Sequence, residues 1–152
     1  MADIHLQVQL SRPPADVWTA LFSAAARRIW WAYGIQLRSE SGSPFFEYWR
    51  DGEGHERVSR GKVLAVKKQR LLRLSWQDDD WPVATQVEFR LASKRGATNL
   101  TLVHSGFEAL GTKLLYNVEE YTNGWEALLD DLRTYLEGPA EELAEPLEDD
   151  EP

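Results

Sequence analysis

The chain has 152 residues, of which 43% are hydrophobic and 28% are charged, as is typical of one globular domain. It contains no cysteine, which excludes disulfides, thiolate catalysis and cysteine-ligated metals. The net charge is −8, but eight of the 25 acids lie in residues 137–152, so 17 acids and 17 bases balance in the rest. A neutral body with an acidic end lacks the basic surface that nucleic-acid binding requires.

The sequence shows neither a membrane segment nor a secretion signal. No run of about 18 apolar residues is present, so we expect no membrane span. Residues 1–5 form neither the basic nor the apolar part of a signal peptide. Together with the absence of cysteine, this favours a soluble cytoplasmic protein.

The N-terminal third predicts one strand followed by two short helices. Residues 4–10 alternate apolar and polar side chains, which predicts a half-buried strand. Ser11 is expected to cap a helix that begins at the two following prolines and extends to about Phe22. A second helix is predicted over residues 24–30.

The middle of the chain predicts a meander of strands, and the end predicts a long helix. Strands are expected over residues 35–39, 45–50, 58–66, 70–76, 84–91 and 98–104. Gly61, inside one of them, indicates a bend. Apolar residues recur at steps of three and four from Tyr121 to Leu136, and Gly138 ends the pattern. We therefore expect an α+β fold in which this helix covers a curved antiparallel sheet of about six to seven strands and leaves space beneath it.

Several stretches resemble a known family. They are residues 14–21, the pair Trp30-Trp31, and residues 61–64, 72–76, 98–102, 104–107 and 124–129. In order and spacing they resemble the bacterial branch of the activator of heat-shock-protein-90 ATPase homologue (AHSA) family, within the START-like or SRPBCC superfamily that includes the birch-pollen allergen. The resemblance implies a helix-grip fold over residues 1–137. We expect residues 138–152 to form a disordered acidic tail.

The chain departs from this family in two places. Residues 67–70 read Lys-Lys-Gln-Arg where the family usually has a proline, which is a change in a turn. The eukaryotic activators also carry a separate N-terminal domain that contributes to chaperone stimulation, and this chain has no counterpart of it. The family name is therefore not expected to describe its activity.

Ten residues are predicted to line a ligand cavity. They are Trp31, Trp49, Trp76, Phe89, Leu102, His104, Phe107, Tyr121, Trp125 and Leu128. The tryptophans could form an aromatic cage or fill the core, and both interpretations stay open. His104 shares the inward phase of the apolar residues before it. It is either a polar anchor or proton-transfer group at the end of the cavity, or a structural histidine bonded to backbone or to a tryptophan N–H.

No catalytic, metal or cofactor site is predicted. His5 and His55 are expected to face solvent, and with His104 they lack the spacing of metal ligands. Residues 78–80, three consecutive aspartates, are interpreted as a solvated turn, and residues 119–120, two glutamates, as helix surface. No phosphate-binding loop or nucleophile elbow occurs.

The leading functional hypothesis is a non-enzymatic binding protein for an apolar or aromatic small molecule, lipid-like molecules included. The first alternative, from the resemblance and the charged tail, is a stress-related co-chaperone-like module with a chaperone or another protein as partner. The second is a helix-grip enzyme of cyclase or hydrolase type. A homodimer is also an open alternative, because a neutral body with many aromatic residues could self-associate.

Overall fold

The computed structural model describes residues 3–32 and 34–138, except for the side chains of residues 112–116. The predicted acidic tail lies outside these residues apart from Gly138. The elements, in chain order, are β1 (Ile4–Leu10), α1 (Pro14–Phe22), α2 (Ala24–Trp30), β2 (Ile35–Gln36), β3 (Pro44–Arg50), β4 (Glu56–Lys67), β5 (Leu71–Asp78), β6 (Thr85–Lys94), β7 (Ala97–Ser105), the 3₁₀ segment η1 (Phe107–Lys113) and α3 (Leu114–Leu136).

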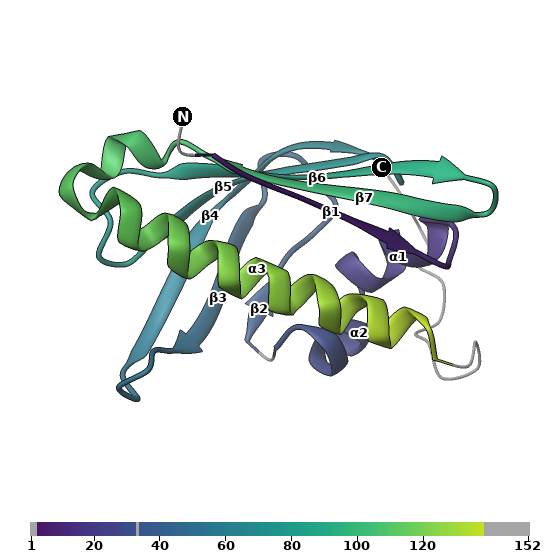
Figure 1. Ribbon diagram of the computed structural model, residues 1–152, viewed down its shortest axis with the longest axis horizontal. Helices are drawn as coiled ribbons and strands as arrows, with labels where there is room; N and C mark the ends of the chain where they lie inside the picture. Colours follow the sequence, from purple (N-terminus) through teal and green to yellow (C-terminus); the bar gives the residue numbers. More distant parts are fainter. Residues whose placement is uncertain (1–2, 33, 139–152) are drawn as a thin grey trace.

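The seven strands form one antiparallel sheet in the order β1-β7-β6-β5-β4-β3-β2. Figure 1 shows that the sheet is strongly bent: β3 and β4 turn away from the direction of β1, β6 and β7. Helix α3 crosses the concave side of the sheet, and α1 and α2 lie at one end of it. The predicted α+β fold, with two short helices after the first strand and one long helix on a curved sheet, is confirmed.

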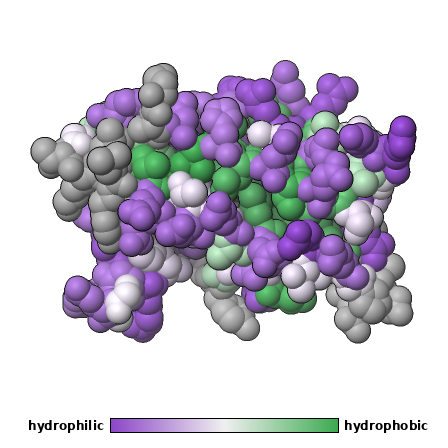
Figure 2. Space-filling model, in the orientation of Figure 1, coloured by the Kyte–Doolittle hydropathy of each residue, from purple (hydrophilic) through white to green (hydrophobic). Residues whose placement is uncertain are grey.

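The core lies between α3 and the half of the sheet formed by β1, β7 and β6. Helix α3 buries Trp125, Leu129, Leu132 and Leu136, at the three- and four-residue steps seen in the sequence. Burial of each leucine contributes about 1.5–3 kcal/mol. Figure 2 shows polar side chains over most of this face of the molecule, with an apolar band between β1 and α3.

Two helix boundaries differ from those predicted. The first residue of α1 is Pro14, and Pro13 occupies the N-cap position without a side-chain capping bond, so the prediction that Ser11 caps this helix was wrong. The proline at the first helical position lacks an N–H that would need a cap. Helix α3 begins at Leu114, before the predicted start at Tyr121; the apolar repeat continues back from Tyr121 through Val118 to Leu114, which the prediction did not use.

Gly61 lies where β4 approaches the backbone of β5 closely. A Cβ atom built on this glycine would lie 1.9 Å from the backbone oxygen of Ser75 on β5. At the same place the backbone N–H of Lys62 donates to Ser75 Oγ at 2.8 Å instead of to a strand carbonyl. The missing side chain thus allows β4 to cross β5 closely, as glycine in a strand commonly does. The sequence predicted a bend at Gly61, and the structure shows a close approach of two strands there.

We expect Gly61→Ala to lower the free energy of unfolding by about 2–3 kcal/mol, because the new methyl group can be accommodated only if the two strands separate. Urea denaturation would measure the change. Gly52→Ala is the matched control: Gly52 is exposed, a Cβ atom added to it would meet nothing within 4 Å, and its effect should stay within about 0.5 kcal/mol. Equal stability of the two variants would contradict the role given to Gly61.

Candidate functional site

A cavity of about 280 Å³ lies between α3 and the bent part of the sheet. Its lining residues are Trp31, which follows α2, Glu47 and Trp49 on β3, Trp76 on β5, and Glu120, Tyr121, Gly124, Trp125 and Leu128 on α3. The volume is near the lower end of the range for small-molecule sites. The backbone of α3 lies close to β1 and α2, whereas long side chains bridge the distance to β5. Because α3 lies farther from β5 than from β1 and α2, the cavity between α3 and β5 is not filled.

Gly124 opens the helical wall of the cavity. It lies on the same face of α3 as Glu120, Tyr121 and Leu128, at helical spacings of three and four. It is exposed, and a Cβ atom added to it would meet nothing within 4 Å. Any larger residue here would extend into the free space.

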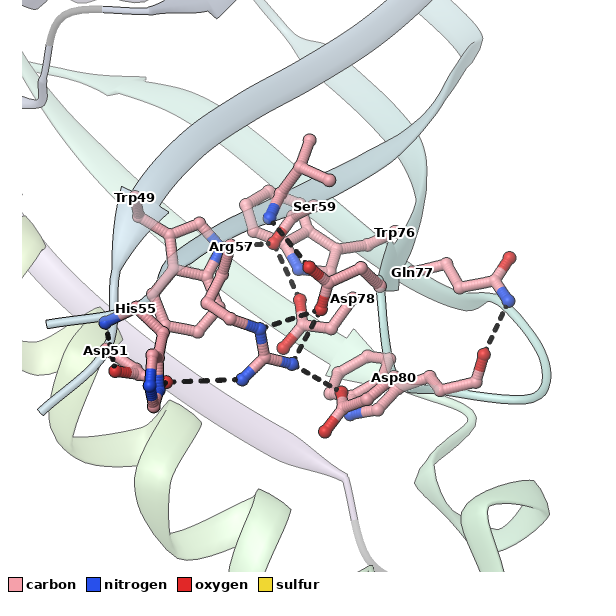
Figure 3. Close-up of polar contacts among 12 residues, drawn as sticks. Trp49, Asp51, His55, Arg57, Ser59, Trp76, Gln77, Asp78 and Asp80 are labelled. Carbon is pink, nitrogen blue, oxygen red and sulfur yellow. Dashed lines mark hydrogen bonds and ion pairs between the residues drawn. The ribbon is translucent and has the colours of Figure 1, made fainter. Parts of the chain in front are cut away.

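A row of polar side chains crosses the sheet at the floor of this region. Glu47 on β3 pairs in register with Ser59 on β4, and Ser59 pairs with Asp78 on β5. Ser59 Oγ donates to Asp78 Oδ1 at 2.6 Å and accepts from Trp49 Nε1 at 3.0 Å. Figure 3 shows two members of this row, Ser59 and Asp78, to the right of Trp49 and beside Trp76. Because residues paired across strands share a face of the sheet, all three side chains point to the concave side.

Asp78 joins the sheet to the helix. Tyr121 OH donates to Asp78 Oδ1 at 2.6 Å and accepts from Trp76 Nε1 at 2.9 Å. Burial raises the pKa of Asp78, and the bonds from Ser59 and Tyr121 oppose the rise. The side chain of Asp78 is 5% exposed, so the interpretation of residues 78–80 as a solvated turn was wrong for this residue.

The next two aspartates are bound to Arg57. Arg57 Nη2 lies 2.6 Å from Asp79 Oδ1 and 3.0 Å from Asp80 Oδ1, and Arg57 Nη1 lies 3.6 Å from Asp51 Oδ2. Its guanidinium group also lies over the ring of Trp49, with the central carbon 5.4 Å from the ring centroid. Figure 3 shows Arg57 held between Asp51 and Asp80. One base is thus shared by three acids beside the cavity.

Glu47 titrates near neutral pH. Burial, the largest effect, raises its pKa from an ordinary 4.5 to about 7; the N–H of Trp31 opposes the rise and the charge of Asp78 adds to it. Trp31 Nε1 donates to Glu47 Oε2 at 3.3 Å. The cavity therefore contains a carboxyl group that can exchange a proton at physiological pH.

His104 is bonded at both ring nitrogens. Trp125 Nε1 donates to His104 Nδ1 at 3.0 Å, so Nδ1 carries no proton and Nε2 does. Nε2 then donates to Thr85 Oγ1 at 2.7 Å, and Thr85 donates to the backbone oxygen of Trp76 at 2.7 Å. Burial lowers the pKa of His104 to about 3. These bonds match the structural alternative for His104, which holds the indole ring of Trp125 in place.

The structure separates the ten predicted cavity residues into two groups. Six of them line the cavity: Trp31, Trp49, Trp76, Tyr121, Trp125 and Leu128. The other four, Phe89, Leu102, His104 and Phe107, are fully buried and lie outside its lining. Sequence reasoning missed Glu47, Glu120 and Gly124. Glu47 could have been found, because it shares the inward phase of Phe45 and Trp49.

The described residues form neither a cluster of metal ligands nor a membrane-spanning helix. None of their His, Asp or Glu side chains gather in groups of three that could hold a metal ion. None of their helices combines the length and the apolar composition needed to cross a membrane.

A bent antiparallel sheet closed around one long helix, with a cavity between them, defines a helix-grip protein. The chain belongs to the Activator of Hsp90 ATPase homolog 1-like family, whose model matches residues 11–137. This confirms the family predicted from the sequence. Among curated proteins no match was found.

Solved structures show the same fold. Protein CV1439 from Chromobacterium violaceum is 20% identical with a TM-score of 0.78, over 91% of this chain and 99% of that one. The Aha1 dimer from Colwellia psychrerythraea is 18% identical with a TM-score of 0.72, over 90% and 97%. CalU16 from Micromonospora echinospora is 23% identical with a TM-score of 0.68, over 89% and 76%.

We expect Tyr121→Phe to lower the free energy of unfolding by about 1–3 kcal/mol, because Asp78 loses a donor and the N–H of Trp76 loses its acceptor. Urea denaturation would measure this. Tyr48→Phe removes the same hydroxyl group from a side chain that is 56% exposed and should change stability by less than about 0.5 kcal/mol. A loss no larger than that of the control would mean that the bond to Asp78 does not anchor the helix.

We expect Glu47→Gln to gain stability relative to the unchanged protein as pH rises from 5 to 7. The folded protein keeps the Glu47 proton up to pH about 7, whereas the unfolded chain releases it near 4.5, so ionisation of this group lowers stability by up to about 1.4 kcal/mol per pH unit in that interval. Glutamine lacks this penalty.

Urea denaturation at several pH values would measure the difference between the two proteins. His104 has the opposite effect, since its lowered pKa makes the folded protein more stable as pH rises from about 3 to 6.5, but it is present in both proteins and cancels. Glu119→Gln, at an exposed position of α3 outside the cavity lining, is the matched control measured in the same way. A flat profile for Glu47→Gln would contradict the raised pKa.

Proposed function

We propose that this protein binds a small organic molecule with apolar or aromatic character in the cavity between α3 and the bent sheet. The observation that carries the proposal is a cavity of about 280 Å³ walled by four tryptophans. Concave, mainly apolar spaces with a few polar groups are typical ligand sites. The family gives the fold but names no ligand for this chain.

The four tryptophans are held in place by their own N–H groups. Trp31 donates to Glu47, Trp49 to Ser59, Trp76 to Tyr121 and Trp125 to His104. Since each N–H already has a protein acceptor, the rings offer the cavity their π-faces and apolar edges rather than free donors. A ligand would meet walls that are already ordered, which lowers the entropy cost of binding.

The enzyme alternative has one observation in its favour, the carboxyl group of Glu47. A general acid or base works best when its pKa is near the working pH, and Glu47 meets that condition. His104, the other candidate, is neutral and bonded at both nitrogens. The co-chaperone and homodimer alternatives are supported only by the family description and by the Aha1 dimer, which are properties of relatives. Binding therefore ranks first.

We expect a panel of neutral one- and two-ring aromatic fragments to shift the indole N–H signals of Trp31, Trp49, Trp76 and Trp125 in nitrogen-15 NMR spectra. The signals of Trp30 should stay unchanged, because its indole is buried against the α1 backbone, where it donates to the oxygen of Ala20. In Gly124→Leu, which fills the space, affinity should fall at least tenfold. Gly124→Ala is the control: it adds one methyl group and should keep affinity within a few-fold.

The two variants also distinguish a loss of binding caused by a filled cavity from a loss caused by unfolding of the protein. Replacement of a glycine inside a helix favours the helix by about 1 kcal/mol, so Gly124→Ala should be at least as stable as the unchanged protein. If no fragment shifts the four signals, or if Gly124→Leu binds as well as Gly124→Ala, the cavity is not the binding site.

A further inference from the structure

We propose that the ligand of this cavity is an organic cation, a substituted ammonium group held among the tryptophan rings with Glu47 as its counter-ion. The inference rests on the proposed binding function and adds the chemical class of the ligand. It is carried by the joint placement of aromatic faces and a carboxyl group in one cavity.

The charges around the cavity are predominantly negative. Among the described residues that line it, Glu47 and Glu120 are acids and none is Lys, Arg or His. Asp78 lies two strands from Glu47 in the same cross-strand row, near enough for its charge to raise the pKa of Glu47. The base beside the cavity, Arg57, is shared by Asp51, Asp79 and Asp80 and cannot neutralise the site. Such a field attracts cations and disfavours anions.

The aromatic walls favour a cation as well. The face of a tryptophan ring is negative and attracts ammonium groups, by about 0.5–1 kcal/mol at exposed sites and about 2 kcal/mol where water is excluded. Because all four N–H groups are bonded within the protein, the π-faces and apolar edges of the rings are what remains for a ligand. Trp49 already contacts one cation, the guanidinium group of Arg57.

Glu47 and Asp78 differ in how fully they are bonded. Asp78 accepts two hydroxyl donors at 2.6 Å, from Ser59 and Tyr121. Glu47 accepts, among the described residues, one longer bond of 3.3 Å from Trp31. A carboxylate has about four acceptor positions, so Glu47 retains capacity on the side that faces the cavity. An ammonium group bound there would place a positive charge beside Glu47, and none of the described lining residues carries one.

This arrangement predicts how affinity depends on pH. The groups that face Glu47 are Trp31 after α2, Asp78 on β5, and Glu120 and Tyr121 on α3. Of these, the two acids add negative charge and none supplies a cation. A bound cation favours ionised Glu47, so binding below pH about 7 must release its proton. Affinity should therefore rise with pH, by up to tenfold per unit below 7, and level off above it.

The test uses three probes of nearly equal shape: choline, its neutral carbon analogue 3,3-dimethylbutan-1-ol, and the anion 3,3-dimethylbutanoate. Each is titrated into the full chain while the indole N–H signals of Trp31, Trp49, Trp76 and Trp125 are followed by NMR. We expect choline to bind at least tenfold more tightly than the neutral alcohol at pH 8, and the anion to bind most weakly. The preference for choline should fall about tenfold at pH 6.

Two variants assign the effect to Glu47. Glu47→Gln should reduce choline affinity at pH 8 about tenfold, leave the neutral alcohol unchanged, and abolish the pH dependence. Glu119→Gln, an exposed glutamate of α3 outside the cavity lining, is the matched control and should change choline affinity less than twofold. The pH profile of the unchanged protein tests the same point if Glu47→Gln does not fold.

The outcomes distinguish this inference from the proposed function. If the neutral alcohol or the anion binds as tightly as choline, or if the aromatic fragments bind and choline does not, the cation inference is overturned and the binding function stands. If neither the three probes nor the aromatic fragments shift the four signals, both are overturned.

Discussion

Two side chains of α3, one helical turn apart, fasten the helix to the sheet through buried hydrogen bonds. Tyr121 donates to Asp78, and Trp125 donates to His104. Apolar packing alone is non-directional and would let the helix settle closer to the sheet or slide along it. The two bonds fix both its height and its register, because each acceptor left alone in the interior would cost about 1–3 kcal/mol. The open space exists because the helix is held at that height and has no side chain at Gly124, between the two anchors.

The hydrogen bonds between α3 and the sheet also explain why acids are present on the inner face of an apolar sheet. A buried carboxyl group is costly unless it is bonded, and Asp78 is bonded to Ser59 and Tyr121. Glu47, two strands away in the same row, receives one weaker bond and keeps a pKa near 7. Of the two acids, Asp78 therefore holds the helix on the sheet through its hydrogen bonds, whereas Glu47 keeps acceptor positions that a ligand could use. In the proposed cation site, this contrast between the two acids, rather than the number of tryptophans, would determine which ligands bind.

Much of the fold could be predicted from sequence because its signals are local. Alternation identifies β1 and β6, and the three- and four-residue repeat identifies the second half of α3. The site could be predicted only in part. Trp49 and Trp76 were found because aromatic residues in an inward phase are conspicuous. Glu47 and Asp78 were not, because a charged residue in a strand or before a turn is usually exposed, and only the pairing of β3, β4 and β5 places them together.

The bend of the sheet divides the molecule into a packed part and an open part. On one side, Leu100, Leu102 and Leu132 are fully buried and provide the stability. On the other, β3 and β4 turn away, so that only long side chains reach α3 and the interior is incompletely filled. The core meets the cavity at Trp76 and Trp125, whereas Glu47 and Gly124 line the cavity without belonging to the core, so changes at these two residues should affect binding more than folding. A site built in this way can tolerate a partly bonded acid such as Glu47, since the free energy that holds the chain together comes mainly from residues that do not touch it.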